Sequence, residues 1–426
     1  MARGARNDRR SGRGEDEMLR SMLERHPRPD WVRRINAMGD SVGGAENLIT
    51  IDAGELIDLA RSSTGLEDFG DFDGDWRGRL EALVRDMNGH ADLSTIGRLM
   101  SRQEILRCLR TRLFMTRRLA EEPGILDEEV GAPIIVSGQA RSGTTILFEL
   151  LALDPNARSI AGYESAYPVP ETEDRDALLA MTECEQELWC DLQPEYASIH
   201  EHRSDLPVEC ITPTMASFGS MMWFVTNSPQ EWAPDFVGTM QFHKVFLQLL
   251  QYGKPRAHWV LKTPTHLPVL DLVFTTYPEA WIVLTHRDPM KTIPSGLSTL
   301  SMVRWQRANH VDLESIAQSG TGMYDLMVDI KRRRDEGSLP DRFVDLHFLD
   351  LMRDPPAAIR EAYATMALSF DESYGERIQN YIANKPRGKF GTHRYDVADW
   401  GFSTDEIRER TRSYVDAYGV MLEEDS

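Results

Sequence analysis

The stretch PIIVSGQARSGTTIL, residues 133–147, decides the fold of this chain. Its apolar start predicts a buried strand, its glycine-bounded centre predicts a loop, and its end predicts the first turn of a helix. A loop between a strand and a helix aims backbone N–H groups and the positive end of the helix dipole at one point. The stretch therefore predicts a cradle for an anion such as a phosphate.

This cradle departs from the Walker A pattern at one position. Gly138 and Gly143 have the Walker spacing and Thr145 stands at the Ser/Thr position, but Thr144 replaces the lysine. The cation of the loop is instead Arg141. Because ATP-using loops place that lysine on the terminal phosphates, its absence argues against ATP chemistry.

The overall composition limits the class of partner. The chain has 426 residues, enough for a sizeable core, and a formal net charge of −20. Such an acidic balance argues against nucleic acid or an anionic membrane as the main partner, so any anionic ligand must be bound by a local group of cations.

Targeting and redox signals are also weak. The first residues are Arg-rich without an apolar stretch, and no run of about 18 apolar residues occurs, which indicates neither export nor a membrane span. The four cysteines form no C-x-x-C pattern and no Cys/His cluster in the sequence, which disfavours a zinc site and a disulfide framework and fits a reducing cytoplasm.

The periodicity divides the chain into three regions. Residues 1–17 are expected to form a disordered tail, and residues 18–130 a helical N-terminal cap in which Leu80, Leu83, Val84 and Met87 repeat at helical spacing. Residues 131–426 are expected to form an α/β domain with a helical insertion at about 175–250. The second half of this insertion is rich in Met, Trp and Phe, which indicates core packing, with an apolar wall of an acceptor pocket as the alternative.

Three further short runs of β-branched and aromatic residues predict buried strands at 259–261, 281–285 and 343–348. Helical stretches separate them, so the strands are expected to pair in parallel as a P-loop-like sheet flanked by helices. Ligands gather at the carboxyl ends of such strands. The residues to examine are therefore those that directly follow each strand.

Cations follow three of the predicted strands, at Arg141, Lys262 and Arg287. Ser295 stands eight residues after Arg287, a spacing that places a guanidinium at a strand end and a hydroxyl on the next helix, where both can hold one phosphate. A basic glycine loop at 387–389 could fold over the same phosphate. In an acidic chain, this convergence indicates a ligand with more than one anionic group.

Together these residues carry a family resemblance. The loop at 138–145, the Arg287 and Ser295 pair and the strand end KTPTHL at 262–267 resemble the PAPS-dependent sulfotransferases, and in particular bacterial members of about this length. The resemblance extends from about Leu48 to Tyr418. It implies a P-loop-like α/β fold and the donor 3'-phosphoadenosine 5'-phosphosulfate (PAPS).

The resemblance also implies roles for individual residues. The 5'-phosphosulfate would be bound by Arg141, Ser142, Gly143, Thr144 and Thr145. The 3'-phosphate would be bound by Arg287 and Ser295, with Arg387, Gly388 and Lys389 closing over it. Where cytosolic sulfotransferases have an adenine-stacking Trp, this chain has Ile146.

Sulfuryl transfer explains the missing Walker lysine. A sulfuryl group in transfer carries less charge than a phosphoryl group, so fixed N–H donors and cations can replace magnesium, and we expect no metal in the reaction. Lys262 is the candidate for neutralising the bridging oxygen of the leaving adenosine 3',5'-bisphosphate. The acceptor is expected to be a hydroxyl of a small, apolar or lipid-like molecule.

Several residues compete as the base that takes the acceptor proton. Glu164 lies 23 residues after Arg141 and resembles the catalytic glutamate of tyrosylprotein and heparan sulfotransferases, so it is the first choice. His202 is the second, with His200 beside it, and His266 resembles the histidine of the Lys-Thr-His strand end in cytosolic sulfotransferases, displaced by two residues.

Two other functions remain open from the sequence. A nucleotide-dependent phosphotransferase would bind ATP with magnesium, and a non-catalytic nucleotide-binding module would keep the cradle without a base or Lys262. The replaced Walker lysine argues against the first, and the presence of Lys262 and Glu164 argues against the second.

Overall fold

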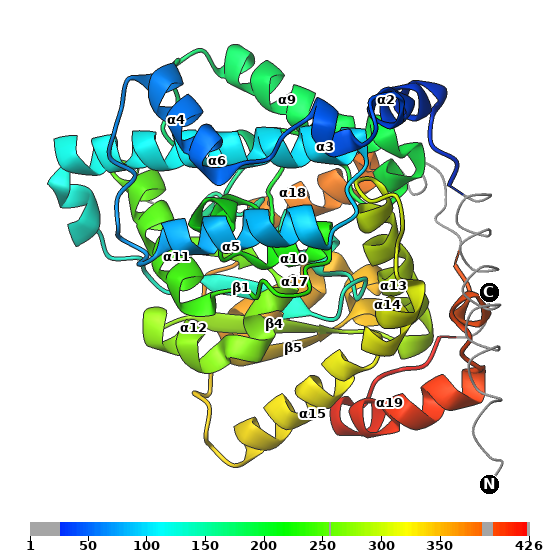
Figure 1. The fold of residues 1–426 in the computed structure, drawn as a ribbon. Coiled ribbons are helices and arrows are strands. Elements are labelled where there is room, and N and C mark those ends of the chain that lie inside the picture. Colours follow the sequence, from blue (N-terminus) through cyan, green and yellow to red (C-terminus); the bar gives the residue numbers. More distant parts are fainter. Residues whose placement is uncertain (1–25, 255–256, 386–394, 424–426) are drawn as a thin grey trace, which may run out of the picture.

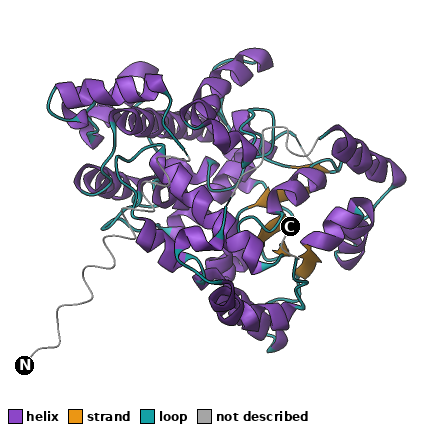
Figure 2. Cartoon of the chain, turned by 90° about the vertical axis from the view of Figure 1, so that its right-hand side faces the viewer, coloured by secondary structure: helices purple, strands orange, loops and turns teal. Residues whose placement is uncertain are grey.

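The computed structural model describes residues 26–254, 257–385 and 395–423. A five-stranded sheet lies at its centre with helices around it (Figure 1 and Figure 2). All neighbouring strands pair in parallel, in the order β2-β3-β1-β4-β5. The strands are β1 (Ile134–Gly138), β2 (Ala157–Arg158), β3 (His258–Lys262), β4 (Trp281–His286) and β5 (Phe343–His347).

The helices before the sheet form the N-terminal region. They are α2 (Asp30–Ser41), α3 (Ala45–Leu48), α4 (Ala53–Thr64), α5 (Trp76–Gly89) and α6 (Thr95–Glu121), followed by the short 3-10 helix η1 (Pro123–Asp127). Asp52, Asp75 and Ser94 cap α4, α5 and α6, because each side chain accepts a hydrogen bond from a backbone N–H of the first turn.

Most of the remaining helices connect the strands. Between β1 and β3 lie α7 (Thr144–Leu151), α8 (Gly162–Ala166), α9 (Arg175–Leu192), η2 (Pro194–Ser198), η3 (Pro213–Ser217), α10 (Met221–Asn227) and α11 (Phe236–Gln251). Between β3 and β5 lie η4 (Pro264–Val269), α12 (Leu270–Thr276), α13 (Pro289–Trp305), α14 (Leu313–Ser319) and α15 (Gly322–Asp335). After β5 follow α16 (Phe348–Arg353), α17 (Pro355–Thr365), α18 (Glu372–Asn384), η5 (Val397–Trp400) and α19 (Thr404–Tyr418).

Strand β1 is buried on both faces. Ile135 packs into the large core that includes α4 to α6, α11 and α12, whereas Ile134 and Val136 pack into a second core with α7, α17 and α18. Side chains alternate between the two faces of a strand, so an unbroken apolar run is what a central strand covered on both sides requires. This arrangement places the end of β1, and the loop after it, at the middle of the sheet edge.

The predicted parallel sheet flanked by helices, with a helical region before it, is confirmed. Helix α7 begins at Thr144, directly after the predicted glycine-bounded loop. Strand β2 was not predicted, because two half-buried residues carry no periodic pattern. The predicted tail at 1–17 and the basic loop at 387–389 lie outside the described residues.

The Met-, Trp- and Phe-rich part of the insertion is mainly core. Seven of its large side chains are buried: Met215, Phe218, Trp223, Trp232, Met240, Phe242 and Phe246. In the part of the chain that the structure describes, no helix is both long enough and apolar enough to cross a membrane.

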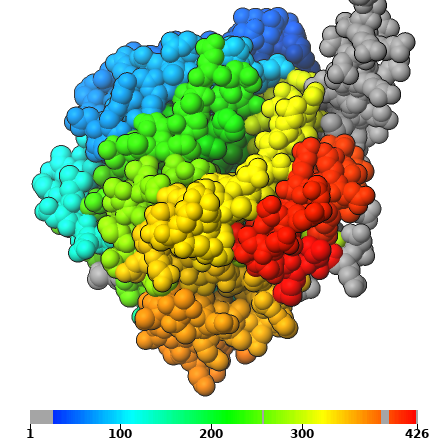
Figure 3. Space-filling view, turned by 90° about the horizontal axis from the view of Figure 1, so that it is seen from below, coloured from blue at the N-terminus to red at the C-terminus, as the bar shows by residue number. Residues whose placement is uncertain are grey.

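The C-terminal segment returns to the sheet edge. Helix α19 packs against α13 and α15. In Figure 3 the red segment that contains α19 lies beside the yellow segment that contains α15. The chain beyond α19 brings Glu423 to the residues that follow β4, where its backbone N–H donates to Asp288 Oδ2 at 2.7 Å.

Candidate active site

The loop between β1 and α7 has the backbone of an anion cradle. Gly138 and Gly143 have φ values of 136° and 96°, which side-chain-bearing residues rarely adopt. A Cβ atom on Gly138 would lie 2.6 Å from Thr285 Oγ1, and one on Gly143 would lie 2.5 Å from Phe348 Cδ2. Both glycines are therefore required by the close approach of β4 and α16.

The first turn of α7 keeps its N–H groups free of a side-chain cap, since its N-cap residue is Gly143. Uncapped N–H groups at a helix N-terminus are donors for an anion. Ser142, in contrast, is fully buried, and its hydroxyl bonds to Gln139 O and to Thr285 Oγ1, each at 2.5 Å. The Ser142 side chain thus fixes the shape of the loop.

The structure brings Arg141, Ser295 and Arg287 together beside the cradle. The Arg141 Nε donates to Ser295 Oγ at 3.1 Å, and Arg287 Nη1 donates to the Arg141 carbonyl oxygen at 3.3 Å. Burial lowers the pKa of the Arg141 guanidinium from its usual value. A buried cation favours an anionic partner, because charge–charge attraction is stronger away from water.

Arg287 is already held by a carboxylate. Its Nε and Nη2 donate to the two oxygens of Glu423 at 2.8 and 3.1 Å, and its guanidinium lies 4.0 Å from the centre of the Phe348 ring. A bidentate pair of this kind has the geometry that Arg also uses for phosphate. An anion arriving at Arg287 would therefore take the place of Glu423.

Lys262 reaches the cradle from the end of β3. Its ammonium donates to Thr145 Oγ1 at 3.3 Å and is also bonded to Glu209, and its side chain is only 5% exposed. The backbone N–H of Cys210 donates to the Lys262 carbonyl oxygen at 3.0 Å, which fixes the segment that carries Glu209 against β3. Glu209 was missed in the sequence, where it stands in no recognisable motif.

Two of the candidate bases are histidines of the segment after η2, and one of them, His200, lies beside these cations. The His202 ring stacks on Tyr196 and Trp189 at centroid distances of 5.2 and 5.5 Å, and the His200 and His202 rings are 5.9 Å apart. Burial, together with the positive charges of Lys262 and Arg141, holds the pKa of His200 well below its usual range. Burial lowers the pKa of His202 to about 4, so both rings are neutral at pH 7.

The lowered pKa of His202 predicts a pH-dependent stability. Below about pH 6.5 the unfolded chain binds a proton at this ring that the folded chain binds only near pH 4, so the free energy of unfolding falls as the pH falls. Between pH 7 and pH 4.5 we expect His202 to contribute about 2–3 kcal/mol of this loss. Urea unfolding should therefore show a weaker pH dependence for His202→Asn. The same replacement at the exposed His310 is the control, and equal pH dependence of His202→Asn and wild type would contradict the prediction.

The other two candidate bases lie in different surroundings. Glu164 forms an ion pair with Arg158 at 2.9 Å and accepts from the backbone N–H of Ala161 at 3.1 Å, so both of its oxygens are bonded at the start of α8. His266 is buried in η4, with its ring 5.8 Å from that of His243.

The described residues on either side of the predicted basic loop interact with α7 and with Arg141. Lys385 is bonded to Glu149 of α7, and Tyr395 contributes to the electrostatic surroundings of Arg141. Arg387, Gly388 and Lys389 themselves lie outside the described residues, so their proposed role stays a prediction.

A pocket of about 560 Å³ lies between α6 and α9, and we refer to it as the α6–α9 pocket. Its wall includes His202 and Val208, and Val208 directly precedes Glu209. The apolar part of the wall comprises Leu99, Met100, Ala166, Met181, Leu188, Trp189, Val208, Met215 and Met222. The pocket is therefore mainly apolar, large enough for a small-molecule ligand, and lined by the residue next to Glu209 in the chain.

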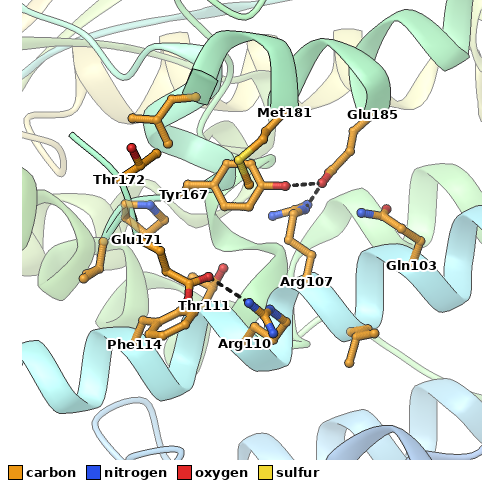
Figure 4. A pocket seen from close by; sticks show the side chains of 14 residues that line it. Gln103, Arg107, Arg110, Thr111, Phe114, Tyr167, Glu171, Thr172, Met181 and Glu185 are labelled. Atoms are coloured by element: carbon orange, nitrogen blue, oxygen red, sulfur yellow. Dashed lines mark hydrogen bonds and ion pairs between the residues drawn. The ribbon is translucent and has the colours of Figure 1, made fainter. Parts of the chain in front are cut away.

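A second pocket of about 200 Å³ adjoins it and shares Arg107, Tyr167 and Glu185 (Figure 4). Glu185 accepts from Tyr167 at 2.7 Å and pairs with Arg107 at 2.9 Å, and Arg110 pairs with Glu171 at 2.8 Å. Because these charges are paired with one another, the second pocket is a weaker candidate for a charged ligand.

Comparisons with known proteins agree with this geometry. Residues 133–372, more than half of the chain, match the model of the sulfotransferase family. The chain is 24% identical to the omega-hydroxy-beta-dihydromenaquinone-9 sulfotransferases Stf3 of Mycobacterium tuberculosis and Mycobacterium bovis. Each match spans 313 residues, 67% of this chain and 75% of the relative.

Solved structures share the fold. The sulfotransferase STF9 of Mycobacterium avium superposes with a TM-score of 0.74 at 23% identity, over 88% of this chain and 99% of that one. The sulfotransferase STF1 of Mycobacterium tuberculosis H37Rv superposes with a TM-score of 0.68 at 24% identity, over 85% of this chain and 98% of that one. The matched residues 133–372 include the cradle after β1 and all five strands of the sheet. The chain therefore belongs to the sulfotransferase family.

Proposed function

We propose that this enzyme transfers a sulfuryl group from PAPS to a hydroxyl of a small, apolar or lipid-like acceptor. The observation that carries the proposal is the pairing of two anion sites. One is the cradle loop and the uncapped start of α7, with Arg141 and Lys262 as cations, and the other is the pair Arg287 and Ser295, to which Arg141 is bonded. PAPS has two anionic groups, the 5'-phosphosulfate and the 3'-phosphate, and each matches one of these sites.

In this proposal the cradle binds the 5'-phosphosulfate through the backbone N–H groups of Gly143, Thr144 and Thr145. Arg141 adds a cation, and Ser142 contributes by fixing the loop. The 3'-phosphate lies against Arg287 and Ser295, displaces Glu423, and is covered by the basic loop at 387–389.

The transfer step follows from this placement. A bond forms between the acceptor oxygen and sulfur, and the bond between sulfur and the bridging phosphate oxygen breaks. The leaving adenosine 3',5'-bisphosphate gains negative charge at that oxygen, and Lys262 neutralises it. The acceptor hydroxyl loses its proton to a base of the protein.

The α6–α9 pocket is the proposed acceptor site. Its apolar wall favours an apolar molecule, and Val208 of that wall directly precedes Glu209, which is bonded to Lys262. The mycobacterial relatives are named for a hydroxylated menaquinone lipid, which has the same combination of a hydroxyl and an apolar body. A long isoprenoid chain would extend beyond the 560 Å³ of the pocket, which holds the hydroxyl-bearing end.

We assign the base to Glu209, the carboxylate that lies on Lys262, in preference to Glu164 and His202. The ion pair of Glu209 with Lys262 uses its Oε1, whereas both oxygens of Glu164 are bonded, to Arg158 and to Ala161. His202, with its pKa near 4, is a weak proton acceptor at pH 7. We expect Glu209→Gln to lower kcat by about 10²–10⁴-fold and Glu164→Gln to lower it by less than about tenfold. Both replacements exchange a carboxylate for an amide of the same shape, so each variant serves as the control for the other. The reverse order of effects, with unchanged donor binding, would return the assignment to Glu164.

Transfer itself can be tested with purified enzyme, PAPS and a panel of lipid alcohols and hydroxylated quinones. We expect mass spectrometry to detect a sulfated product and an equal amount of adenosine 3',5'-bisphosphate, with no dependence on added magnesium. The proposal fails if no hydroxylated acceptor is sulfated while a matched panel of phosphate acceptors is phosphorylated from ATP.

A further inference from the structure

Three metal-ligating side chains meet in the interior behind Lys262. Cys210 lies in the segment after Val208, His243 lies on α11, and His266 lies on η4. One donor atom of each, a sulfur or an imidazole nitrogen, lies within 4.8 Å of the other two. All three residues are buried, with exposures of 1%, 1% and 8%.

Both imidazoles in this cluster have an unsatisfied nitrogen. The Nε2 atoms of His243 and His266 are buried and have no hydrogen-bond partner within the described structure. The Nδ1 of His243 lies 2.8 Å from the hydroxyl of Tyr277. When this Nδ1 donates its proton to the hydroxyl, Nε2 is left with a free lone pair, which is the tautomer that a metal ligand needs.

The three ligands border a small cavity with room for one ion. A cavity of about 20 Å³ is lined by Cys210, His243 and His266, and the described lining residues include no carboxylate. A tetrahedral zinc site has donor atoms about 3.4–3.8 Å apart, given bond lengths of about 2.0–2.3 Å. The cluster reaches that spacing when its donors move together by about 1 Å or less.

The donor set selects the kind of metal. Two imidazoles and one thiolate suit zinc, whereas Mg²⁺ and Ca²⁺ require oxygen ligands. A buried nitrogen without a partner is costly, and one bound ion would satisfy both imidazoles at once. We propose that Cys210, His243 and His266 bind one Zn²⁺ ion, with a fourth ligand supplied by water in the cavity.

The position of this site gives it a structural role next to the catalytic residues. Cys210 directly follows Glu209, and its backbone N–H donates to the Lys262 carbonyl oxygen. His266 follows Lys262 on the segment after β3. A zinc ion therefore links α11, η4 and the segment that carries Glu209, and it holds Glu209 against Lys262.

The test begins with untagged wild-type protein, dialysed against micromolar Zn²⁺ and then against metal-free buffer. We expect elemental analysis to find about one zinc per chain, and we expect chelation to lower Tm by about 5 °C or more. Replacement of zinc by Co²⁺ should give the visible bands of a tetrahedral site and a thiolate-to-cobalt charge-transfer band.

Matched variants separate this site from adventitious binding. Cys210→Ser and His243→Gln should each retain less than about a tenth of the wild-type zinc. Cys108→Ser, which also removes a fully buried thiol, should retain all of it. Because His266→Asn removes a ligand from a different segment, it replaces either variant that does not fold. Wild-type protein without stoichiometric zinc, stoichiometric copper in its place, or full zinc in Cys210→Ser would each overturn the proposal.

Discussion

Lys262→Met is expected to lower kcat by about 10²–10³-fold, with less than about threefold change in the affinity for adenosine 3',5'-bisphosphate. The ammonium lies at the end of β3, is 5% exposed and bonds to Thr145 at the start of α7. In the proposed reaction it is therefore fixed beside the point where the bridging oxygen gains charge. A cation that acts on charge formed during transfer affects the rate more than it affects binding of the ground state.

Lys244→Met on the exposed face of α11 is the matched control and should keep wild-type activity. Because Glu209 loses its partner when Lys262 is replaced, Tm and bisphosphate affinity are measured on the same preparation to verify folding. A folded Lys262→Met enzyme with kcat within threefold of wild type would contradict the role of Lys262.

Arg287→Gln is expected to weaken binding of adenosine 3',5'-bisphosphate by about 30–150-fold, since a hydrogen-bonded pair with a charged group contributes about 2–3 kcal/mol. Binding of adenosine 5'-monophosphate, which lacks the 3'-phosphate, should change by less than about threefold. Isothermal titration calorimetry of both nucleotides on wild type and variant measures the difference. Equal weakening of the two nucleotides would show that Arg287 does not recognise the 3'-phosphate.

Glu423 provides an independent control for this site. Its carboxylate occupies Arg287, and its backbone, held by Asp288, does not depend on the side-chain charge. Glu423→Gln should therefore tighten bisphosphate binding by about two- to fivefold, the range of a partly exposed ion pair. Weaker binding in Glu423→Gln would mean that this carboxylate supports the site instead of competing for it.

The parts of the fold that could be predicted from the sequence are those encoded locally. The apolar run at 134–136, the two glycines after it and the apolar helix from Thr144 specify a buried strand, a loop and a helix within 15 residues. The parallel sheet followed from strands separated by helices. Because the carboxyl ends of parallel strands share one edge, the sequence also predicted the approach of Lys262 and Arg287 to the cradle.

Contacts between distant segments could not be predicted in this way. Glu209 lies in a mixed segment without periodicity, and contacts between distant segments, such as the hydrogen bond between Cys210 and Lys262, bring it to the site. The cluster of Cys210, His243 and His266 was missed for the same reason, because a search for ligands at short spacing does not detect side chains from three separate elements. The engagement of Glu164 by Arg158 depends on β2, the strand that had no sequence pattern.

The most direct test of the central claim is the change in Tm on adding nucleotide. A ligand that binds the folded state raises Tm. We predict a rise of several degrees with 1 mM adenosine 3',5'-bisphosphate, a concentration of about 100 times a Kd of about 10 μM, and no comparable rise with ATP and magnesium. A rise with ATP and magnesium, together with none for the bisphosphate, would contradict PAPS-dependent sulfuryl transfer by this enzyme.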